Sequence, residues 1–559
     1  MSDHAGLALG IDIGGTFTDI VVLDLADGRS WSHKELTTHV DPADGVLSGV
    51  RHVAAAHGLE LSRATRVAHA TTLFTNALIE RRGAVTGLLM TAGFSDTLQI
   101  GRERKYDLYD LAIERPTPLV PRNLCADVAE RVHADGSVAV PLDEEDLLGA
   151  ARRLVEAGAT SLAVVFLHSF AHPAHERRAA ELLLEAFPGV EVTISSEVAA
   201  QIREYERAST TAVNASIKPL AGLYLEGMRD RLVELGVDAP LHLLLSNGGL
   251  SDVAEAKRVP ARLLESGPAA GAIAAAHFGA ADGGGDLLAF DMGGTTAKLC
   301  CIEGGEPAIA FGFEAARERR FVPGSGLPVQ ISAIDLIEIG AGGGSIARVD
   351  RLGLLKVGPQ SAGSEPGPAA YGRGGTEPTV TDADFLLGSL DPASFAGGGF
   401  GIDMTAAEAA VGRLAETLGL SLVETAAGIR DVVEEQMAAA ARMHLAERGV
   451  DASRFALLAT GGAGPVHADG LARKLRPAAG HLPALGRRRL RARPPPRTGA
   501  GGPRRHRRRR RRHLRPRRPR GRLRRAGGGG ARGRRRHRGG SRERHGRAAG
   551  RWPVRRTGF

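Results

Sequence analysis

The sequence predicts an α/β fold of two similar lobes followed by a disordered basic tail. Apolar β-branched runs alternate with helical patterns at the spacing typical of strands and helices packed in layers. A strand, a Gly-Gly turn and a returning strand near the N-terminus recur about 280 residues later, which indicates a duplicated unit. After residue 474 the chain is rich in arginine, glycine and proline and has too few large apolar residues to form a core.

The first lobe is predicted over residues 7–195. It opens with a hairpin, because residues 7–24 form two apolar runs joined by a polar Gly-Gly turn. The remaining predicted elements are helices over 44–56, 72–80, 144–156 and 175–186 and strands over 66–69, 85–90, 161–167 and 191–195.

The second lobe is predicted over residues 196–474. Residues 287–303 repeat the opening hairpin, and a third Gly-rich turn follows the apolar strand within 455–465. The Gly/Pro-rich residues 340–375 carry ordered motifs, so we do not interpret them as a linker. The other predicted elements are a helix over 204–233, a strand over 241–245 and a helix that begins at Ser266.

Charge is distributed unevenly along the 559 residues. Residues 475–559 hold 33 of the 73 basic residues and one acidic residue, so this segment carries +32 and the preceding body carries −22. An acidic body argues against nucleic acid as a specific partner. Three cysteines without paired spacing argue against a disulfide framework or a zinc cluster and favour a cytoplasmic protein. We also expect no secretion signal and no membrane association.

The tail over residues 475–559 has two interpretations. Its charge suits a basic arm that binds nucleic acid or an acidic surface. Alternatively, the reading frame shifts near Lys474 in a GC-rich gene, because the tail lacks lysine and isoleucine and uses residues with GC-rich codons. We favour the frame shift, which predicts a chain less stable or less active than its frame-corrected form and leaves a truncated, inactive product as an alternative.

Both hairpins contain an aspartate followed, after one residue, by Gly-Gly-Thr; the aspartates are Asp12 and Asp291. Main-chain N–H groups of such a turn can approach phosphate oxygens closely, and threonine hydroxyls add donors. A neighbouring carboxylate suits Mg²⁺, which keeps much of its hydration and takes few protein ligands. A single Gly-Gly turn would indicate only a tight hairpin. Two copies in register predict a phosphate and Mg²⁺ site.

The third turn, Gly461-Gly462-Ala463-Gly464, has a bare backbone against which a base and ribose can lie. The three turns together resemble the ATP site of the sugar kinase, actin and heat-shock ATPase superfamily, whose lobes have a ribonuclease H-like fold. These turns do not resemble a Walker A site, because no GxxxxGK[ST] sequence occurs in the chain, and they do not resemble a dinucleotide-binding fingerprint.

Over residues 7–474 the chain closely resembles the hydantoinase A and 5-oxoprolinase family, ATP-dependent enzymes that act on cyclic amides. The segment 340–384 is peculiar to this family and is absent from kinases and actins. Ala370 and Thr460 depart from the usual family residues without affecting the expected nucleotide site. The matching stretches are GIDIGGTFTDIVV, HATTLFTNALIERRGA, GFSDTLQIGRERKYDLYDL, LLLSNGGL, ESGPAAGAIAAA, FDMGGTTAKL, IEIGAGGGSIARVD, VGPQSAGSEPGPAAYGRGGTEPTVTDA and LLATGGAGPVHA.

The resemblance implies roles for residues of all three turns. Asp12 and Asp291 would be the catalytic residues, which organise Mg²⁺ and the attacking group. The implied phosphate ligands are Gly14, Gly15, Thr16, Thr18, Gly293, Gly294, Thr295 and Thr296, and the residues that flank adenosine are Gly461, Gly462 and Gly464.

The function implied by the resemblance is ATP-dependent hydrolysis of a hydantoin or 5-oxoproline type ring through phosphorylation of the amide carbonyl oxygen, together with a hydantoinase B type partner subunit. The ATP-using subunit of a ketone carboxylase would have the same site. A nucleotide-gated binding protein of the actin or heat-shock type is a third possibility, but the sequence shows no polymer or peptide surface that it would need.

Several other polar residues have weaker functional readings. Arg102, Arg104, Asp107 and Asp110 could face a substrate, although a solvated charged loop is an equal alternative. His168, His172 and His175 are expected to be capping or surface residues, not a metal cluster. Cys300 and Cys301 lie on the second returning strand, so at least one should be a core residue.

Overall fold

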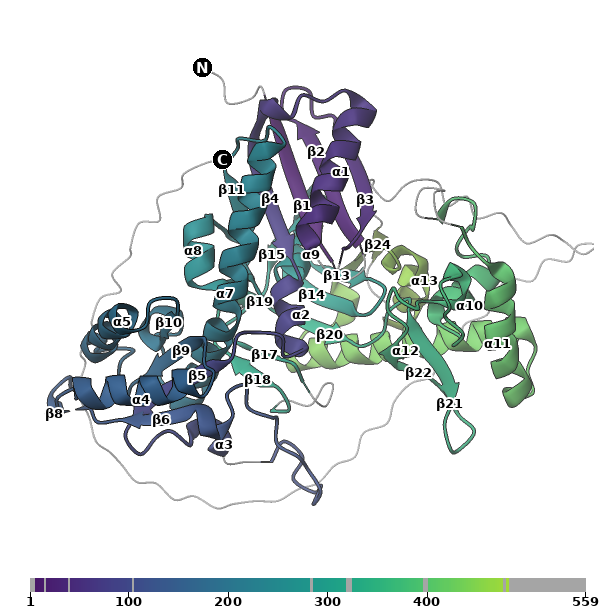
Figure 1. The fold of residues 1–559 in the computed structure, drawn as a ribbon. Coiled ribbons are helices and arrows are strands. Elements are labelled where there is room, and N and C mark those ends of the chain that lie inside the picture. The colour runs from purple at the N-terminus through teal and green to yellow at the C-terminus, as the bar shows by residue number, and fades with distance from the viewer. Residues whose placement is uncertain are drawn as a thin grey trace, which may run out of the picture. The chain divides into compact units, whose positions relative to one another are not determined.

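The structure is a computed structural model that describes residues 6–14, 17–38, 41–102, 105–281, 285–317, 324–395, 401–475 and 479–481. Strands and helices alternate along this part of the chain, as the sequence predicts (Figure 1). Two six-stranded sheets and one four-stranded sheet organise it.

The first six-stranded sheet has the order β12-β11-β4-β1-β2-β3. β1, β2 and β3 pair antiparallel, whereas β4 runs parallel to β1 and β11 runs parallel to β4. The predicted N-terminal hairpin is therefore the centre of this sheet. The strands are β1 (Leu7–Ile13), β2 (Phe17–Asp24), β3 (Ser30–Leu36), β4 (Ala64–Thr71), β11 (Leu241–Leu244) and β12 (Leu250–Ser251).

Helix α1 (Pro42–His57) packs on β2 and β3 and contributes apolar residues to the core of this sheet. Asp41 caps its first turn by accepting a hydrogen bond from Ala43 N, and Pro42 occupies a first-turn position that needs no donor. The long helix α7 (Glu204–Glu234) adds Val213, Ile217 and Leu225 to the same core, among others. Apolar residues that alternate along β1 thus have a helical layer to pack against.

The second six-stranded sheet repeats this arrangement. Its central strand β13 pairs antiparallel with β14, and β14 pairs antiparallel with β20. On the other side β23 runs parallel to β13, and β24 runs parallel to β23. The order β20-β14-β13-β23-β24 therefore corresponds strand by strand to β3-β2-β1-β4-β11, and the predicted two-lobed α/β fold is confirmed. The strands are β13 (Leu287–Met292), β14 (Ala297–Glu303), β15 (Glu306–Pro307), β20 (Leu336–Ile339), β23 (Ala456–Thr460) and β24 (Ala479–His481).

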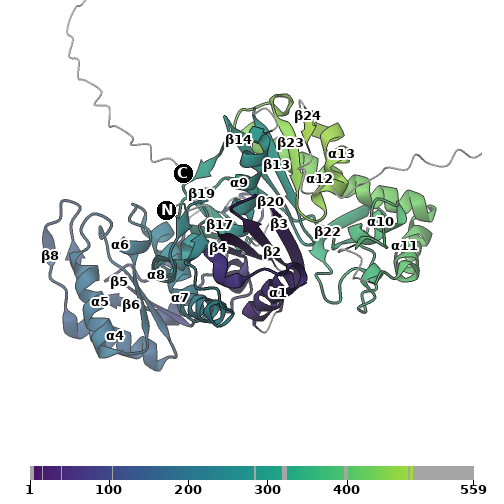
Figure 2. The same cartoon turned by 90° about the horizontal axis from the view of Figure 1, so that it is seen from above.

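Helices from the C-terminal part of the described chain bury the second sheet. α12 packs on β14 and β20, and α13 packs on β13 and β23. Figure 2 shows α10 and α11 beside α12 and the β22 strand. The elements are α10 (Val380–Leu386), α11 (Met404–Leu418), α12 (Leu422–Glu447), α13 (Gly464–Leu475), β21 (Ser345–Val349) and β22 (Leu355–Ser361).

The four-stranded sheet, ordered β10-β9-β5-β6, is entirely parallel and begins after α2 along the chain. Its buried strands and helices α4 and α5 share a separate apolar core. The elements are β5 (Thr86–Thr91), β6 (Cys125–Val128), β9 (Ser161–Val165), β10 (Glu191–Ile194), α3 (Thr97–Ile100), α4 (Glu144–Glu156), α5 (Ala174–Ala186) and α6 (Ser195–Val198).

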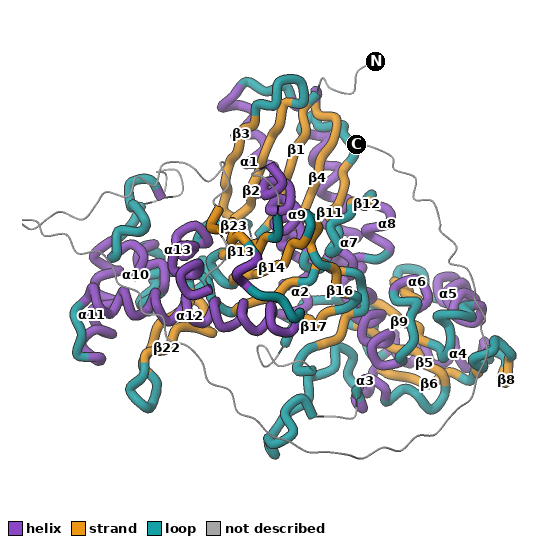
Figure 3. Tube along the Cα trace, turned by 180° about the vertical axis from the view of Figure 1, so that it is seen from behind, coloured by secondary structure: helices purple, strands orange, loops and turns teal. Residues whose placement is uncertain are grey.

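Helix α9 (Ser266–Ala281) contacts β4 and β11 of the first large sheet and β13, β14 and β23 of the second. Figure 3 shows it between strands of the two sheets. The remaining elements are helices α2 (Leu73–Ile79) and α8 (Val253–Arg258) and the short strands β7 (Arg131–Val132), β8 (Val138–Val140), β16 (Ile309–Ala310), β17 (Phe313–Ala315), β18 (Leu327–Val329) and β19 (Ala333–Ile334).

The lobe boundary at residue 195 stays a prediction. The first large sheet also includes β11, which follows this boundary in the sequence. Strand β24 lies among the first residues of the predicted tail. The rest of the tail, residues 482–559, and residues 476–478 lie outside the described residues, so the prediction of disorder is not addressed.

Candidate nucleotide site

The two predicted phosphate turns occupy equivalent places in the two large sheets. Asp12 and Asp291 are each the penultimate residue of a central strand, β1 or β13. The turn after Asp12 is closed by a hydrogen bond from Gly14 N to Phe17 O of 3.0 Å, and the turn after Asp291 by one from Gly293 N to Thr296 O of 3.0 Å. The duplication read from the sequence thus extends to the hydrogen bonding of the turns.

The tips of these turns differ in how much the structure describes. Gly15 and Thr16 lie outside the described residues. In the second turn Gly293, Gly294 and Thr295 are exposed, although Gly293 N already donates a hydrogen bond within the turn. Thr296 is half-buried where β14 begins.

Thr18, predicted as a phosphate ligand, lies in the interior. Its hydroxyl is 3.1 Å from the hydroxyl of Thr37, which in turn donates a hydrogen bond of 2.9 Å to Gly14 O. The structure therefore places Thr18 where it supports the first turn through Thr37.

Both aspartates approach the same face of α9. A Cβ atom added at Gly267 would lie 3.3 Å from Asp12 Oδ1, and one added at Gly271 would lie 3.9 Å from Asp291 Oδ2. Residues four apart share one face of a helix, so α9 presents small residues to both carboxylates. The i, i+4 spacing of these two glycines, within the matching stretch ESGPAAGAIAAA, is the sequence signal that could have identified this contact.

The two carboxylates are electrostatically strained. Burial raises the pKa of Asp12 to about 6, and the charges of Asp19 and Asp291 add to this rise. Burial likewise raises the pKa of Asp291, while the charge of Lys298 opposes that rise. Asp12 Oδ1 is buried without a hydrogen-bond partner. A buried acceptor of this kind beside a second carboxylate fits a hydrated divalent cation.

The third turn packs directly on the end of β13. Gly461 has φ of +79°, and a Cβ atom there would overlap Asp291 Oδ1 and the main chain of Met292. Ala463 N donates a hydrogen bond of 2.9 Å to Met292 O. Gly462 is exposed with open space around it, whereas Gly464 is buried at the start of α13. The predicted adenosine turn therefore adjoins the second phosphate turn.

The Gly-rich segment after β20 braces the second turn. Gly343 N and Gly344 N donate hydrogen bonds of 3.1 Å and 2.6 Å to the carbonyl oxygens of Gly293 and Gly294. A Cβ atom at Gly342 would collide with the main chain of Gly294. The glycines of this segment are thus required by a close approach of two backbones.

A row of charged residues crosses each hairpin at the level of its aspartate. The first charge row is Asp12, Asp19 and Lys34, which are register partners on β1, β2 and β3. The second charge row is Asp291, Lys298 and Glu338, which are register partners on β13, β14 and β20. Lys298 and Glu338 were not predicted as functional residues. Lys298 lies opposite Asp291 within the predicted hairpin, so its alignment could have been inferred, whereas that of Glu338 depends on the pairing of β14 with β20, which the sequence does not reveal.

Lys298 also lies near Glu265, which directly precedes α9. Its Nζ is 3.7 Å from Glu265 Oε2 and 3.6 Å from Glu338 Oε1. Burial opposes the charge of Lys298, but Glu265 and Glu338 outweigh it and raise the pKa of the ammonium group. Glu265 has φ of +60°, a conformation that costs free energy in a non-glycine residue and is held here by the surrounding structure.

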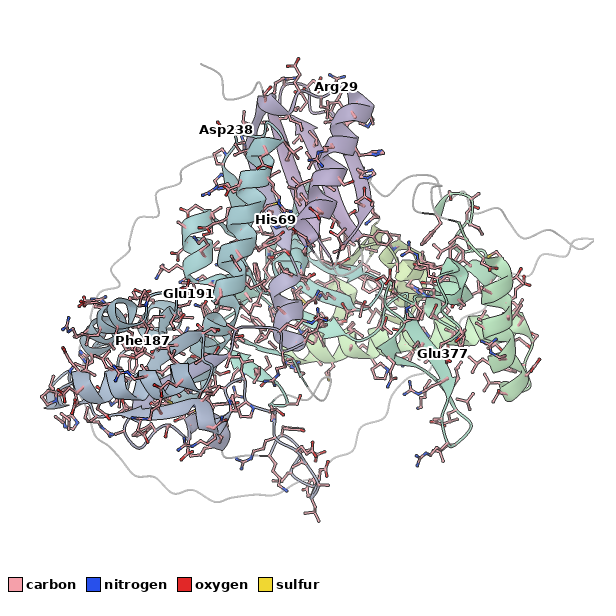
Figure 4. The ribbon with its side chains drawn as sticks, viewed as in Figure 1. Arg29, His69, Phe187, Glu191, Asp238 and Glu377 are labelled. Carbon is pink, nitrogen blue, oxygen red and sulfur yellow. The ribbon has the colours of Figure 1, made fainter. Side chains whose placement is uncertain are left out.

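His69, within the matching stretch HATTLFTN, is a core residue of β4 (Figure 4). Its Nε2 is 2.9 Å from Tyr224 Oη, and its Nδ1 is 3.3 Å from Ile11 O. Burial lowers the pKa of His69 to about 4, so the ring is neutral at physiological pH. This histidine links β4 to α7 and does not approach the turns as a charged group.

Arg102 forms ion pairs with Glu206 at 2.8 Å and with Glu314 at 3.2 Å, and it lines two adjoining cavities of about 360 and 790 Å³. Asp107 and Asp110 accept hydrogen bonds from main-chain N–H groups of their own loop. Arg104 lies outside the described residues. That this segment faces a substrate and that it forms a solvated charged loop both stay predictions.

Two of the three histidines expected to be capping or surface residues lie close to protein atoms of their own. His172 Nε2 is 3.2 Å from Ala134 O, and His175 Nδ1 is 2.7 Å from Glu130 Oε2. Across the described ranges, no group of three or more His, Cys, Asp or Glu side chains is arranged to hold a metal ion.

Cys300 and Cys301 are both buried and unpaired. None of the helices that the structure describes has the length and apolar character needed to cross a membrane.

Comparisons with known proteins identify related sequences over most of the described chain. Residues 8–187 match a family described as the hydantoinase/oxoprolinase N-terminal region, and residues 207–478 match a family described as hydantoinase/oxoprolinase. These two ranges contain all three predicted turns.

Curated relatives include an oxoprolinase and subunits of a caprolactamase and of a carboxylase. Caprolactamase subunit alpha of Pseudomonas jessenii is 37% identical over 84% of this chain and 67% of that subunit. Acetophenone carboxylase gamma subunit of Aromatoleum aromaticum is 36% identical over 83% of this chain and 64% of that subunit. Arabidopsis thaliana 5-oxoprolinase 1 is 31% identical over 83% of this chain and 39% of that protein.

Two solved structures share the fold. The nucleotide-free structure of acetone carboxylase matches with a TM-score of 0.73 and 28% identity, and the ATP-dependent caprolactamase of Pseudomonas jessenii matches with a TM-score of 0.71 and 36% identity. Each comparison covers 84% of this chain and 67% of the other. The chain therefore spans about two thirds of the subunits that it resembles, and a smaller share of the 5-oxoprolinase.

Proposed function

The chain belongs to the hydantoinase/oxoprolinase family, and we propose that it takes part in the ATP-dependent hydrolysis of a cyclic amide of the hydantoin or 5-oxoproline type. The observation that carries this proposal is the approach of Asp12 and Asp291, from two copies of one hairpin, to one face of α9. Two phosphate turns, two raised-pKa carboxylates and an adjoining Gly-rich turn supply the parts of a nucleotide site.

The proposed ATP contacts follow from the turns. Main-chain N–H groups and threonine hydroxyls bind phosphate oxygens, and the bare backbone of the third turn leaves room for adenosine. In this proposal Thr18 acts through the first turn, because its hydroxyl is bonded to Thr37. The proposed phosphate residues are Gly14, Gly15, Thr16, Thr18, Gly293, Gly294, Thr295 and Thr296, and the proposed adenosine residues are Gly461, Gly462 and Gly464.

Asp12 and Asp291 are the proposed Mg²⁺-organising residues. The unpartnered, buried Oδ1 of Asp12 and the mutual repulsion of the two carboxylates fit a divalent cation. Bound through water, Mg²⁺ would offset phosphate charge during phosphoryl transfer. The protein contributes two fixed carboxylates and turns that need little rearrangement.

ATP is needed because an unstrained amide is a poor electrophile. In the proposed reaction the amide carbonyl oxygen forms a bond to the terminal phosphorus of ATP while the bond from that phosphorus to the bridging oxygen breaks and ADP leaves. Water then adds to the activated carbon, and the ring nitrogen takes a proton and leaves. A second water converts the resulting acyl phosphate to a carboxylate and inorganic phosphate.

A second candidate is the ATP-using subunit of a ketone carboxylase, which the similarity to acetophenone carboxylase and acetone carboxylase favours. The enol oxygen of a ketone would then be phosphorylated at the same site. Because several relatives are named as subunits, we also propose a partner chain, of the hydantoinase B type that the family resemblance implies. The proposed cytoplasmic location rests on the sequence alone.

The distinguishing experiment measures phosphate release by the full 559-residue chain with Mg·ATP, alone and with a co-purified partner. The panel contains hydantoin, 5-oxoproline, caprolactam, acetone and acetophenone, each with and without bicarbonate. Release that depends on a cyclic amide and is abolished by Asp291→Asn supports the proposal. Strict dependence on a ketone and bicarbonate would transfer the assignment to the carboxylase, whereas a chain that binds no nucleotide would refute both.

A further inference from the structure

The second charge row contains a lysine at the place where the first has an aspartate. Asp19 and Lys298 each lie seven residues after the aspartate of their hairpin and are its register partners. Their outer neighbours are inverted as well, because Lys34 pairs with Asp19 and Glu338 pairs with Lys298. The two hairpins therefore share one topology, but the register partner of the aspartate is negatively charged in the first hairpin and positively charged in the second.

The two lysines differ in how firmly they are held. Lys34 Nζ is 2.6 Å from Asp19 Oδ1, a direct ion pair, and its side chain is 44% exposed. Lys298 is 16% exposed, yet its distances to Glu265 and Glu338 exceed the usual range of a charge-assisted hydrogen bond. A lysine retained only to neutralise a buried carboxylate is expected to contact it directly.

The position of Lys298 is central to the candidate site. It lies beside Asp291 across the β13–β14 pair, and its charge acts on Asp12 as well. Glu265, its half-buried neighbour, directly precedes the α9 turn that reaches Asp12 at Gly267. The ammonium group thus lies close to β13, which carries Asp291, and to the start of α9, which approaches Asp12.

We infer that Lys298 binds the terminal phosphoryl group of the nucleotide and exchanges its loose contacts with Glu265 and Glu338 for phosphate oxygens. This inference rests on the proposed function, because it presumes a nucleoside triphosphate between the two turns. The opposite charge of Asp19 makes the first hairpin unsuited to this contact. Lys298 thereby makes the site selective for a triphosphate over a diphosphate.

The test compares the affinities for Mg·ATP and Mg·ADP by isothermal titration calorimetry on the full chain. We expect Lys298→Met to weaken ATP binding by about tenfold or more, as expected for a lost charge-assisted hydrogen bond, and to change ADP binding by less than about threefold. Lys34→Met is the matched control from the first charge row and should leave the ATP-to-ADP affinity ratio unchanged. Circular dichroism melting checks that both variants fold.

A second variant keeps the inference testable if Lys298→Met does not fold. Glu338 is 55% exposed, so Glu338→Gln should be tolerated; by removing one carboxylate that holds Lys298 it should tighten ATP binding about two- to threefold without affecting ADP. Equal losses for ATP and ADP in Lys298→Met, the same loss in Lys34→Met, or an unchanged ratio in Glu338→Gln would overturn the inference. A wild-type chain that binds neither nucleotide would instead refute the proposed function.

Discussion

The two hairpins of this protein have the same topology and different electrostatics. Both place an aspartate at the end of a central strand and close the following turn with an equivalent hydrogen bond. In the first hairpin another carboxylate lies beside Asp12, whereas in the second hairpin Lys298 lies beside Asp291. Duplication therefore preserves the placement of the carboxylates, while the neighbouring residue gives each half of the site its own charge.

The largest effect is expected from removing either carboxylate. Asp12→Asn and Asp291→Asn should each weaken Mg²⁺-dependent ATP binding by more than about 100-fold, because loss of even an outer partner of a metal site costs about 10- to 100-fold. Titration of ATP with and without Mg²⁺ measures this. If only one variant loses the Mg²⁺ dependence, the functional equivalence of the two aspartates is wrong.

The raised pKa of Asp12 predicts a pH-dependent stability. Asp12 holds its proton more tightly in the folded chain, where its pKa is about 6, than in the unfolded chain, where its pKa has the ordinary value of 3.8. Its contribution therefore makes stability fall as pH rises between these values and stay constant above them. Asp12→Asn should remove this fall and increase the free energy of unfolding at pH 7 by up to about 3 kcal/mol.

Urea denaturation of wild type and Asp12→Asn at several pH values provides the measurement. The difference between their free energies of unfolding should grow from pH 4 to pH 6 and then level off. A constant difference across that window would show that Asp12 is not under electrostatic strain.

The third turn offers a matched pair of glycines. Gly461→Ala places a Cβ atom on Asp291 Oδ1 at a positive φ and should cost about 1–3 kcal/mol of stability as well as ATP affinity. Gly462→Ala meets no protein atom within 4 Å and should have little effect on stability, so any loss of ATP affinity in this variant would come from contact with the proposed adenosine. Thermal melts and ATP titrations of both variants check this. Equal losses of stability in the two variants would show that the turn does not pack against Asp291.

The smallest effect concerns the helix shared by both carboxylates. Gly267→Ala brings a Cβ atom to 3.3 Å from Asp12 Oδ1, so it should weaken Mg²⁺-dependent ATP binding a few-fold. Gly271→Ala leaves an ordinary 3.9 Å contact with Asp291 and should stabilise α9 by up to about 1 kcal/mol through helix propensity. If Gly271→Ala weakened ATP binding in the titrations and Gly267→Ala only raised the melting temperature, Asp12 would not lie next to α9.

Local patterns explain what the sequence predicted. The hairpins and their aspartates are each specified by contiguous residues, so β1, β2, β13 and β14 were predicted close to their observed bounds. The charge rows could not be predicted, because β3 and β20 join the hairpins through pairings that leave no mark in local sequence.

Other omissions had signals that could have been used. No prediction covers α12, although Ser421 and Glu424 form a capping box at its start. The contacts of the 340–384 segment with Gly293 and Gly294 depend on two backbones approaching closely, which a run of glycines permits but does not specify.

The most direct test is a crystal structure of the full chain, with its partner if required, bound to Mg²⁺ and a non-hydrolysable ATP analogue. The account predicts phosphates between the turns that follow Asp12 and Asp291, and the base against the Gly461 turn. A nucleotide bound instead in the cavities lined by Arg102, or phosphates that contact only one of the two turns, would contradict it.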